Sequence, residues 1–474
     1  MKKNYYLLLF LLASGLLWGY TYTMSNSNEV NEDQKMIRAI YSQVLEKGEC
    51  YEDLRYLCKD IGGRLTASPQ AAAAVEWGAQ TLEQLGSDRV EKQAVMVPHW
   101  VRGEKEEARV ISEHIGWESV NIAALGNSIG TPKMGITAPV VEVENVEELE
   151  KMSRSDVSGK IVLNNIRMPD HDVNTFDSYS SCSSERYTGA SAASRLGAKG
   201  YILRSLGHFI DEHPHTGNST YEDGVAKIPM AAISTKHAEL LSGLLEVDKN
   251  TKLHMKMNCE TFPDRESYNV IGEIKGTEKP DEIILVSGHL DSWDNGEGAH
   301  DDGSGVVQSI EVLRTFKALG IQPKRTIRCV LWMNEENGAM GAKEYAKVSE
   351  EKGENHIVAI ESDRGGFVPR GFTADAQNAA FLKEKLALLQ SWQPLFEEYM
   401  LHTFEKGFSG VDVKFLKPQG TLCMGLIPDP QRYFDYHHTP NDTFDKVNKR
   451  ELEMGAASMA ALVYLFSEYG LEQE

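Results

Sequence analysis

The fold is decided by a stretch that spans residues 282–305 and reads EIILVSGHLDSWDNGEGAHDDGSG. It opens with a predicted strand over 282–287, whose aliphatic residues at 283–286 indicate that protein covers both faces. It ends in a glycine-rich turn, after which the spacing of apolar residues predicts a helix over 303–319. A buried strand, a polar loop and a helix in this order indicate an α/β fold with parallel strands.

The same alternation continues toward the carboxyl terminus. Strands are predicted over 326–332 (TIRCVLW) and 356–360 (HIVAI), and both runs are mostly apolar. Helices are predicted over 339–348, 377–390 and 450–466. Buried strands that alternate with helices in this way predict an open sheet with helices on both faces.

Metal-binding side chains follow each of the three strands at the point where it ends. His289 follows the first strand, Glu336 the second and Asp363 the third. Because the carboxyl ends of parallel strands lie at one edge of a sheet, we expect these side chains to lie close together. Asp301, at the start of a helix, and His438, in a late loop, are expected to join them.

Each of these features alone has an ordinary explanation, but their shared position does not. Several carboxylates at one sheet edge repel one another unless cations neutralise them. Imidazole and carboxylate ligands without thiolates are typical of catalytic zinc, and a shared carboxylate indicates a site for two ions. Glu335 is next to the predicted ligand Glu336 but distinct from it, so we predict that it is the general base.

Two further acids are predicted to support the ligands. Asp291 stands two residues after His289 and is expected to accept the second ring proton of that histidine, which fixes its tautomer. Asp302 follows the predicted ligand Asp301. The peptide bond between Asp301 and Asp302 is predicted to be cis, since sites of this kind hold unusual backbone conformations.

Composition excludes some classes of partner. The 474 residues carry a net charge of −21, so nucleic acid and anionic membrane surfaces are not expected to bind. Six scattered cysteines are too few for a disulfide scaffold in a chain of this length, and none forms a C-x-x-C pair.

The first residues are typical of an export signal. Lys2 and Lys3 precede an apolar run over 5–18, which is shorter than the roughly 20 residues that a membrane-spanning helix needs. We predict a signal peptide over 1–24 and a secreted or periplasmic protein. No stable membrane insertion is expected after cleavage.

The remaining chain divides by composition. Helical patterns over 31–60 and 68–85 and strands over 90–97 and 108–112 predict an amino-terminal part of the main domain, at 25–115. From 116 to 262, short Val- and Ile-rich strands broken by Gly, Pro and Asn predict an inserted β-rich module. The main domain resumes at 263–474, and its first strand, over 268–274, has the character of an edge strand.

The metal motif carries a family resemblance. GHLDSWD at 288–294, with the glycines that follow it and the Asp301-Asp302-Gly303 turn, resembles the first metal motif of the M28 metallopeptidases. Stretches outside the motif are also similar to one subgroup of that family; they lie at 98–100, 128–132, 215–217, 223–225 and 227–229. The resemblance therefore covers nearly the whole chain after the signal.

The resemblance implies a mixed-sheet zinc-exopeptidase fold with an inserted protease-associated domain over the site. It implies two zinc ions, with Asp301 as the bridging ligand and Glu335 as the base. His289, His438 and either Glu336 or Asp363 at each ion are the implied terminal ligands. The implied reaction is hydrolysis of small unblocked peptides, and the family often forms homodimers.

Substrate preference is left open by the sequence. Arg364 or Arg370 is a candidate for binding a peptide carboxylate, as in a carboxypeptidase or dipeptidase. An aminopeptidase with the same ions is the alternative, with Glu361 as a candidate for binding the substrate amine. A glutaminyl-cyclase-like acyltransferase is disfavoured by the inserted module. A non-catalytic, receptor-like protein is disfavoured because every ligand and the base are present.

Overall fold

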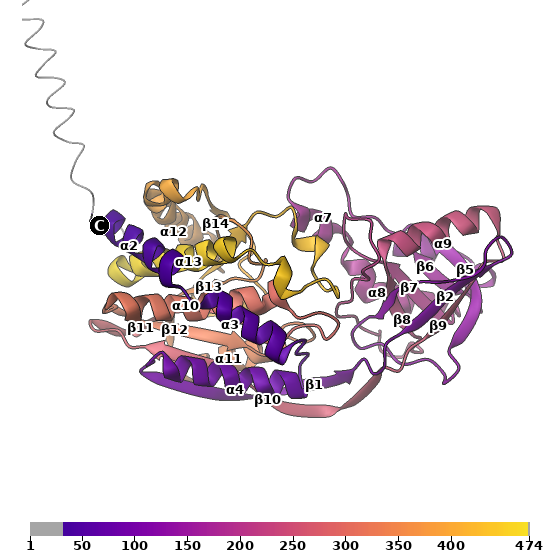
Figure 1. The fold of residues 1–474 in the computed structure, drawn as a ribbon, viewed down its shortest axis with the longest axis horizontal. Coiled ribbons are helices and arrows are strands. Elements are labelled where there is room, and N and C mark those ends of the chain that lie inside the picture. Colours follow the sequence, from indigo (N-terminus) through magenta and orange to yellow (C-terminus); the bar gives the residue numbers. More distant parts are fainter. Residues whose placement is uncertain (1–31, 473–474) are drawn as a thin grey trace, which may run out of the picture.

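Two eight-stranded sheets organise the chain, and a computed structural model describes it over residues 32–472. The signal predicted at 1–24 lies outside the described residues. Each sheet forms the centre of one lobe, and the two lobes lie side by side along the long axis of the molecule (Figure 1).

The sheet of the first lobe is mixed, as predicted. In spatial order its strands are β1 (Arg89–Val101), β10 (Glu260–Ile274), β12 (Arg325–Trp332), β11 (Lys279–His289), β13 (Asn355–Glu361), β16 (Leu422–Pro428), β14 (Pro369–Asp375) and β15 (Thr403–Lys406). Strand β11 is parallel to both of its neighbours, β12 and β13. Strand β10 is antiparallel to β12 and to β1. The prediction of an edge strand here is wrong, because β1 pairs with the outer side of β10.

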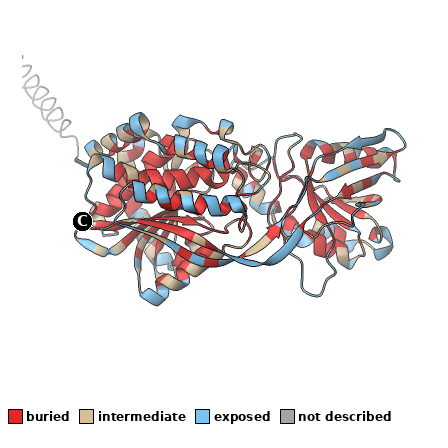
Figure 2. Cartoon of the chain, turned by 60° about the horizontal axis from the view of Figure 1, so that its bottom comes forward, coloured by how far each residue is buried: buried red, intermediate tan, exposed pale blue. Residues whose placement is uncertain are grey.

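Helices cover both faces of this sheet (Figure 2). Successive residues of β11 point to opposite faces: Ile284 and Val286 enter the larger hydrophobic core, whereas Leu285 enters a smaller one. The larger core is covered by α2 (Glu32–Lys47), α3 (Cys50–Tyr56), α4 (Pro69–Gln84), α10 (Ser304–Leu319), α12 (Ala379–Trp392) and α13 (Lys449–Tyr469). The smaller core is covered by α11 (Met340–Lys352) and the 3₁₀ segment Val413–Gln419.

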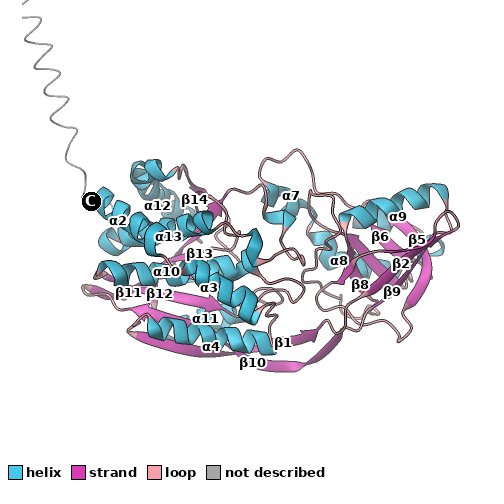
Figure 3. Ribbon diagram, viewed as in Figure 1, coloured by secondary structure: helices cyan, strands magenta, loops and turns pink. Residues whose placement is uncertain are grey.

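The second lobe contains helices and strands in mixture (Figure 3). In spatial order its strands are β3 (Gly116–Ser119), β2 (Glu107–Ser112), β9 (Lys252–Lys256), β5 (Ile136–Val143), β6 (Ile161–Asn164), β7 (Gly200–Arg204), β8 (Met230–Ile233) and β4 (Ile122–Ala124). Its helices are α5 (Val146–Lys151), α6 (Arg154–Val157), α7 (Thr175–Cys182), α8 (Ser184–Arg195) and α9 (Thr235–Val247). The predicted start of the module, at 116, falls inside this sheet, because β2 pairs with β9 rather than with the first lobe.

The second lobe is inserted between β1 and β10, whose paired ends join the two lobes. Val101, the last residue of β1, pairs with Glu260, the first residue of β10. Directly after β1, the buried Arg102 donates from Nη1 to the carbonyl of Ala124 in the second lobe, at 2.7 Å. It also donates from Nε to Asp294 in the first lobe, at 2.9 Å. The lobes are thus connected by strand pairing and by an ion pair between the buried Arg102 and Asp294.

The cysteines and the helices also bear on disulfide bonds and on membrane spans. All six cysteines are buried and unpaired. Within residues 32–472, no helix has the length and apolar character required to cross a membrane.

Candidate metal centre

Asp301 lies at the middle of a buried cluster, with one carboxylate oxygen facing each of two histidines. Its Oδ1 is 3.1 Å from Nε2 of His289, and its Oδ2 is 3.3 Å from Nε2 of His438. Only 5% of the surface of Asp301 is exposed, so neither oxygen is compensated by bulk water. One carboxylate thus connects two imidazoles that come from distant parts of the sequence.

A second carboxylate accompanies each histidine. Oδ1 of Asp363 is 3.4 Å from Nε2 of His289, and Oε2 of Glu336 is 3.2 Å from Nε2 of His438. The sequence leaves open which acid belongs to which histidine, and the structure pairs them. The cluster therefore consists of two half-sites, each with one histidine, one outer carboxylate and one oxygen of Asp301.

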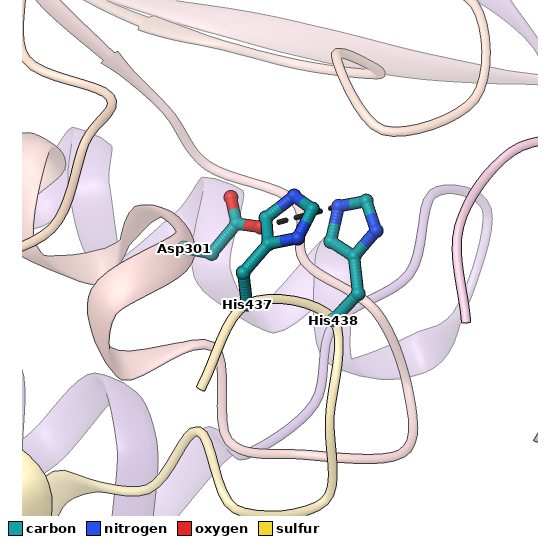
Figure 4. A group of neighbouring side chains, drawn as sticks. All are labelled: Asp301, His437 and His438. Atoms are coloured by element: carbon teal, nitrogen blue, oxygen red, sulfur yellow. Dashed lines mark ion pairs between the residues drawn. The ribbon is translucent and has the colours of Figure 1, made fainter. Parts of the chain in front are cut away.

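The two adjacent histidines of the late loop differ in their contacts (Figure 4). Their rings stack with centroids 3.5 Å apart, and both face Asp301. The Nε2 atom of His437 is 3.8 Å from Oδ2 of Asp301, farther than that of His438, and no contact joins His437 to Glu336. The geometry thus favours His438, the histidine expected from sequence, as the ligand.

Strand ends and a tight turn place these side chains. His289 is the last residue of β11, and Glu336 and Asp363 lie in the turns that follow β12 and β13. Asp301 lies in a π-helical turn, Ala299–Gly303, that leads into α10. Its peptide bond to Asp302 is cis, as predicted.

Asp302 and Asp291 hold backbone groups around the cluster. Asp302 accepts hydrogen bonds from the N–H groups of His289, at 2.9 Å, and Gly305, at 3.0 Å. Asp291 accepts from the N–H groups of Asn334, at 2.7 Å, and Glu335, at 3.1 Å. Both acids therefore fix the loops that carry the predicted ligands and the predicted base.

The predicted contact between Asp291 and the His289 ring involves a different atom from the one expected. Nδ1 of His289 lies 3.0 Å from the backbone carbonyl of Asp291, whereas its distance to the carboxylate is 4.0 Å. The carboxylate is turned away because it accepts the backbone N–H groups of the β12 turn. The outcome for the ring is the same, since a carbonyl acceptor places the proton on Nδ1.

In its neutral form, each histidine therefore presents an unprotonated nitrogen to carboxylate oxygens. Nδ1 of His438 lies 3.2 Å from the carbonyl oxygen of Thr216, so its proton is also on the outer nitrogen. Oδ2 of Asp301 is buried and accepts no hydrogen bond of good geometry among the described residues. Acceptors that face acceptors in a buried site require a cation between them. The donor set, two imidazoles and three carboxylates, fits zinc in both half-sites.

The pKa values of His438 and Glu336 are both raised, as expected for a cluster that lacks positive charge. Burial disfavours the charged ring of His438, but Glu336 and Asp301 outweigh it and raise its pKa to about 9. Burial, and then the charge of Asp301, raise the pKa of Glu336 to about 7. Without metal, protons therefore supply part of the positive charge that the cluster needs.

One supporting acid was not assigned a role from the sequence. The carboxylate of Asp442 accepts the backbone N–H groups of His300, at 2.7 Å, and Asp301, at 3.1 Å. Asp442 thus fixes the backbone of the central carboxylate. Its position four residues after His438 associates Asp442 with the loop that carries this histidine. Nothing in the sequence shows which backbone N–H groups its carboxylate accepts.

Comparison with known proteins places this site in a family. Residues 269–463 match the model of peptidase family M28. Carboxypeptidase Q of Homo sapiens is 37% identical over 432 residues, which cover 91% of this chain and 87% of that protein. The chain belongs to peptidase family M28. It is a zinc metallopeptidase, and the family and enzyme class predicted from sequence are confirmed.

Solved structures agree with the M28 assignment. A peptidase M28 precursor from Shewanella amazonensis has a TM-score of 0.86 and 35% identity, over 92% of this chain and 96% of that one. A zinc aminopeptidase from Bacillus subtilis has a TM-score of 0.63 at 21% identity, over 89% of this chain and 95% of that one. The second comparison shows a shared fold.

The cluster around Asp301 opens into a cavity of about 990 Å³ between the two lobes. The first lobe contributes Asp301, Glu336 and Asp363, together with Glu335, the predicted base. Burial raises the pKa of Glu335 well above its usual range. The second lobe contributes side chains from α7 and α8, so both lobes form the wall of the cavity.

The two arginines predicted to bind a substrate carboxylate both line this cavity, but other groups occupy them. Arg370 forms an ion pair with Asp429 at 2.9 Å. Arg364 donates to the carbonyl of Phe408 at 2.8 Å, and its guanidinium lies over the ring of Phe176. Arg370 is thus neutralised by an acid, whereas Arg364 is held by a carbonyl and a ring.

A third arginine, Arg186 of α8, was not identified from the sequence. It lines the cavity, is 5% exposed, and donates from Nε to the carbonyl of Asn218 at 2.9 Å. Its other partners are Tyr179 and Tyr187, whose rings and hydroxyls both interact with the guanidinium, and none of them is a carboxylate. Its sequence context, a helix rich in Ser and Ala, gives no sign that this arginine faces the metal centre.

Proposed function

We propose that this enzyme hydrolyses small unblocked peptides as a two-zinc exopeptidase of the carboxypeptidase or dipeptidase type. The observation that carries the proposal is the buried Arg186 without an acidic partner, in the cavity that contains the metal cluster. A buried arginine is costly unless an anion pairs with it. The carboxyl terminus of a peptide is an anion that fits a planar guanidinium.

We propose His289, Asp363 and Asp301 as the ligands of one ion, and His438, Glu336 and Asp301 as the ligands of the other. This assignment rests on the distances within the two half-sites. Zinc ions held there supply Lewis acidity, which polarises the scissile carbonyl and activates a water.

Glu335 moves the proton in this scheme. Its side chain lies on the cavity wall, next to Glu336, and none of the ion pairs among residues 32–472 involves it. The carboxylate takes a proton from the attacking water as the C–O bond forms. It then gives that proton to the amide nitrogen as the C–N bond breaks, which releases a free amine.

Arg186 places the substrate relative to these groups. A Cβ atom added to Gly217 would be 2.5 Å from Nη1 of Arg186 and 2.8 Å from Nδ1 of His438, so the two side chains lie close together. In a dipeptide the terminal carboxylate is one residue from the scissile bond, a Cα–Cα step of about 3.8 Å. Carboxylate binding by Arg186 thus puts the last peptide bond at the metal cluster.

The aminopeptidase alternative loses its candidate amine-binding group. The carboxylate of Glu361 accepts three backbone N–H groups, those of Val411, Asp412 and Val413, at 2.8–3.0 Å. It does not line the cavity. The structure thus favours recognition of the carboxyl end over recognition of the amine.

The proposal extends to location and assembly. The apolar run that starts the sequence supports export through a signal at 1–24, and hence a secreted or periplasmic enzyme. The inserted lobe is proposed to be the protease-associated domain expected from sequence. A homodimer stays a prediction.

Zinc content and substrate blocking test the proposal together. We expect about two zinc ions per chain by elemental analysis, and hydrolysis of a free dipeptide such as Ala-Leu. The carboxyl-amidated dipeptide should be a much poorer substrate than the free acid, and the amino-acetylated one should be less affected. One zinc or none, or equal rates on the free acid and the amide, would overturn it.

A further inference from the structure

The two histidines of the metal cluster are oriented by different parts of the molecule. The ring of His289 is held by the carbonyl of Asp291, two residues along the same loop of the first lobe. The ring of His438 is held by the carbonyl of Thr216, which belongs to the second lobe. One half-site is therefore completed within the first lobe, whereas the other depends on the inserted lobe.

Thr216 contacts His438 at two points. Its N–H donates to the backbone carbonyl of His438 at 2.9 Å, and its own carbonyl lies 3.2 Å from Nδ1 of the ring. The two contacts fix both the backbone position of His438 and the rotation of its imidazole. Because a carbonyl only accepts, the contact also selects the tautomer whose Nε2 faces Glu336 and Asp301.

The loop that carries Thr216 is attached to the second lobe. The hydroxyl of Thr216 donates to the carbonyl of Ala124, the last residue of β4, at 2.6 Å. The carbonyl of Gly217 accepts from the N–H of Gly126 at 2.9 Å, and the N–H of His215 donates to the hydroxyl of Ser205 at 2.8 Å. Loop 215–217 is therefore fixed to the second lobe on both sides of Thr216.

We propose that the second lobe is a structural part of the metal centre, with Thr216 as a positioning residue for His438. The ion held by His438 and Glu336 then depends on the seating of the second lobe, whereas the ion held by His289 and Asp363 does not. The inference rests on the two-ion site of the proposed function and adds an asymmetry between its ions. Loss of such an outer hydrogen bond lowers metal affinity by about 10- to 100-fold.

Gly217→Ala is the sharpest test of this contact. Gly217 has a φ of 137°, and the added methyl carbon would lie 2.8 Å from Nδ1 of His438. The methyl group therefore displaces Arg186 and either the ring of His438 or the loop itself, and the last two shifts both disturb the contact between His438 and Thr216. Because the methyl carbon also meets Arg186, hydrolysis is not the readout; the readout is zinc affinity, measured by competition with a chromogenic chelator.

Gly224→Ala is the matched control. Gly224 lies in the same lobe and also has a positive φ, of 79°, but a Cβ there would have no atom within 4 Å. It reports the cost of a side chain at another positive-φ position of this lobe without any contact to the metal centre.

We expect wild type and Gly224→Ala to bind two zinc ions, and Gly217→Ala to bind one normally and the other about 10- to 100-fold more weakly. Unchanged affinity for both ions in folded Gly217→Ala, or equal weakening of both, overturns the inference. If Gly217→Ala does not fold, Thr216→Val takes its place, because it removes the bond to Ala124 at nearly constant volume. This variant should bind one of the two zinc ions at least about threefold more weakly. Unchanged affinity for both ions would contradict the inference.

The failure of this inference is distinguishable from failure of the proposed function. Wild-type protein that binds fewer than two zinc ions, or hydrolyses no dipeptide, contradicts the proposed function. Wild-type protein that binds two ions and is active, with a Gly217→Ala variant that binds both equally well, contradicts only the role of Thr216.

Discussion

Replacement of Arg186 by glutamine separates carboxylate recognition from every other property of the cavity. The side chain is 5% exposed, donates from Nε to the carbonyl of Asn218, and also interacts with the hydroxyls of Tyr179 and Tyr187, but it forms no ion pair with a carboxylate of the protein within residues 32–472. No carboxylate of this part of the chain therefore competes with a substrate for its charge. Glutamine keeps polar character and much of the length of arginine, but it removes the charge and the paired N–H groups.

The expected effect follows from the kind of bond that is lost. A hydrogen bond to a charged group contributes about 1.5–3 kcal/mol net, and a paired guanidinium–carboxylate contact is at the upper end. Loss of about 3 kcal/mol corresponds to a fall of about 100-fold in kcat/KM for a free dipeptide. The carboxyl-amidated dipeptide never forms the charged contact, so its kcat/KM should fall by less than about fivefold.

The assay is a double-mutant cycle with Arg186→Gln as one change and amidation of the substrate as the other. The cycle removes any general damage to the cavity, since such damage affects both substrates. Arg364→Gln is the matched control. It lines the same cavity, but its guanidinium is bound to the carbonyl of Phe408, so its coupling to the substrate carboxylate should be small.

The reasoning is refuted if Arg186→Gln slows hydrolysis of the free acid and of the amide by the same factor. Arg186 would then support the shape of the cavity without contacting substrate. Strong coupling at Arg364 in place of Arg186 would show that the arginine predicted from sequence is the anchor after all.

Two further predictions concern single side chains. Glu335→Gln should retain about two zinc ions and lose about 10²- to 10⁴-fold in kcat, because glutamine cannot accept the proton of the attacking water; near-wild-type turnover would remove Glu335 from this role. His356 is buried in the first lobe, and burial, followed by the charge of Arg328, lowers its pKa to about 3, against about 6.5 in an unfolded chain. Its contribution to stability is complete above pH 6.5 and is lost as the pH falls toward 3, so at pH 5 it costs the wild type about 2 kcal/mol. Denaturant unfolding at pH 7.5 and pH 5 should show that His356→Gln lacks this part of the acid sensitivity, and parallel pH profiles of variant and wild type would contradict it.

The strand ends made the centre of the site predictable. The runs before His289, Glu336 and Asp363 are apolar enough to require burial on both faces, and the carboxyl ends of neighbouring parallel strands must meet. Convergence of these side chains therefore follows from local sequence and topology. Which acid accompanies which histidine does not, because it depends on side-chain directions across the sheet.

Contacts between the lobes could not be predicted. Arg186 and Thr216 reach the site only through the packing of one lobe against the other. Arg186 stands in no local pattern that marks it, and the resemblance at 215–217 does not show that Thr216 contacts a ligand. The start of the inserted module, predicted at 116, was misplaced for a related reason. Strand β2 has the same alternating pattern as strands of the first lobe, and only its pairing with β9 shows which sheet it joins.

The position of the insertion explains why the second lobe can take part in the metal centre at all. Strand β10 is antiparallel to β12, so β10 begins at the edge of the sheet where β12 ends. Strand β1 ends at that same edge, because its last residue, Val101, pairs with Glu260. A segment inserted between β1 and β10 therefore leaves and rejoins the sheet at the edge that carries the metal ligands. An insertion at the opposite ends of these strands would lie far from His438. The topology thus brings Thr216 to the ligand without a long linker, and it makes seating of the second lobe and completion of the second half-site a single structural event.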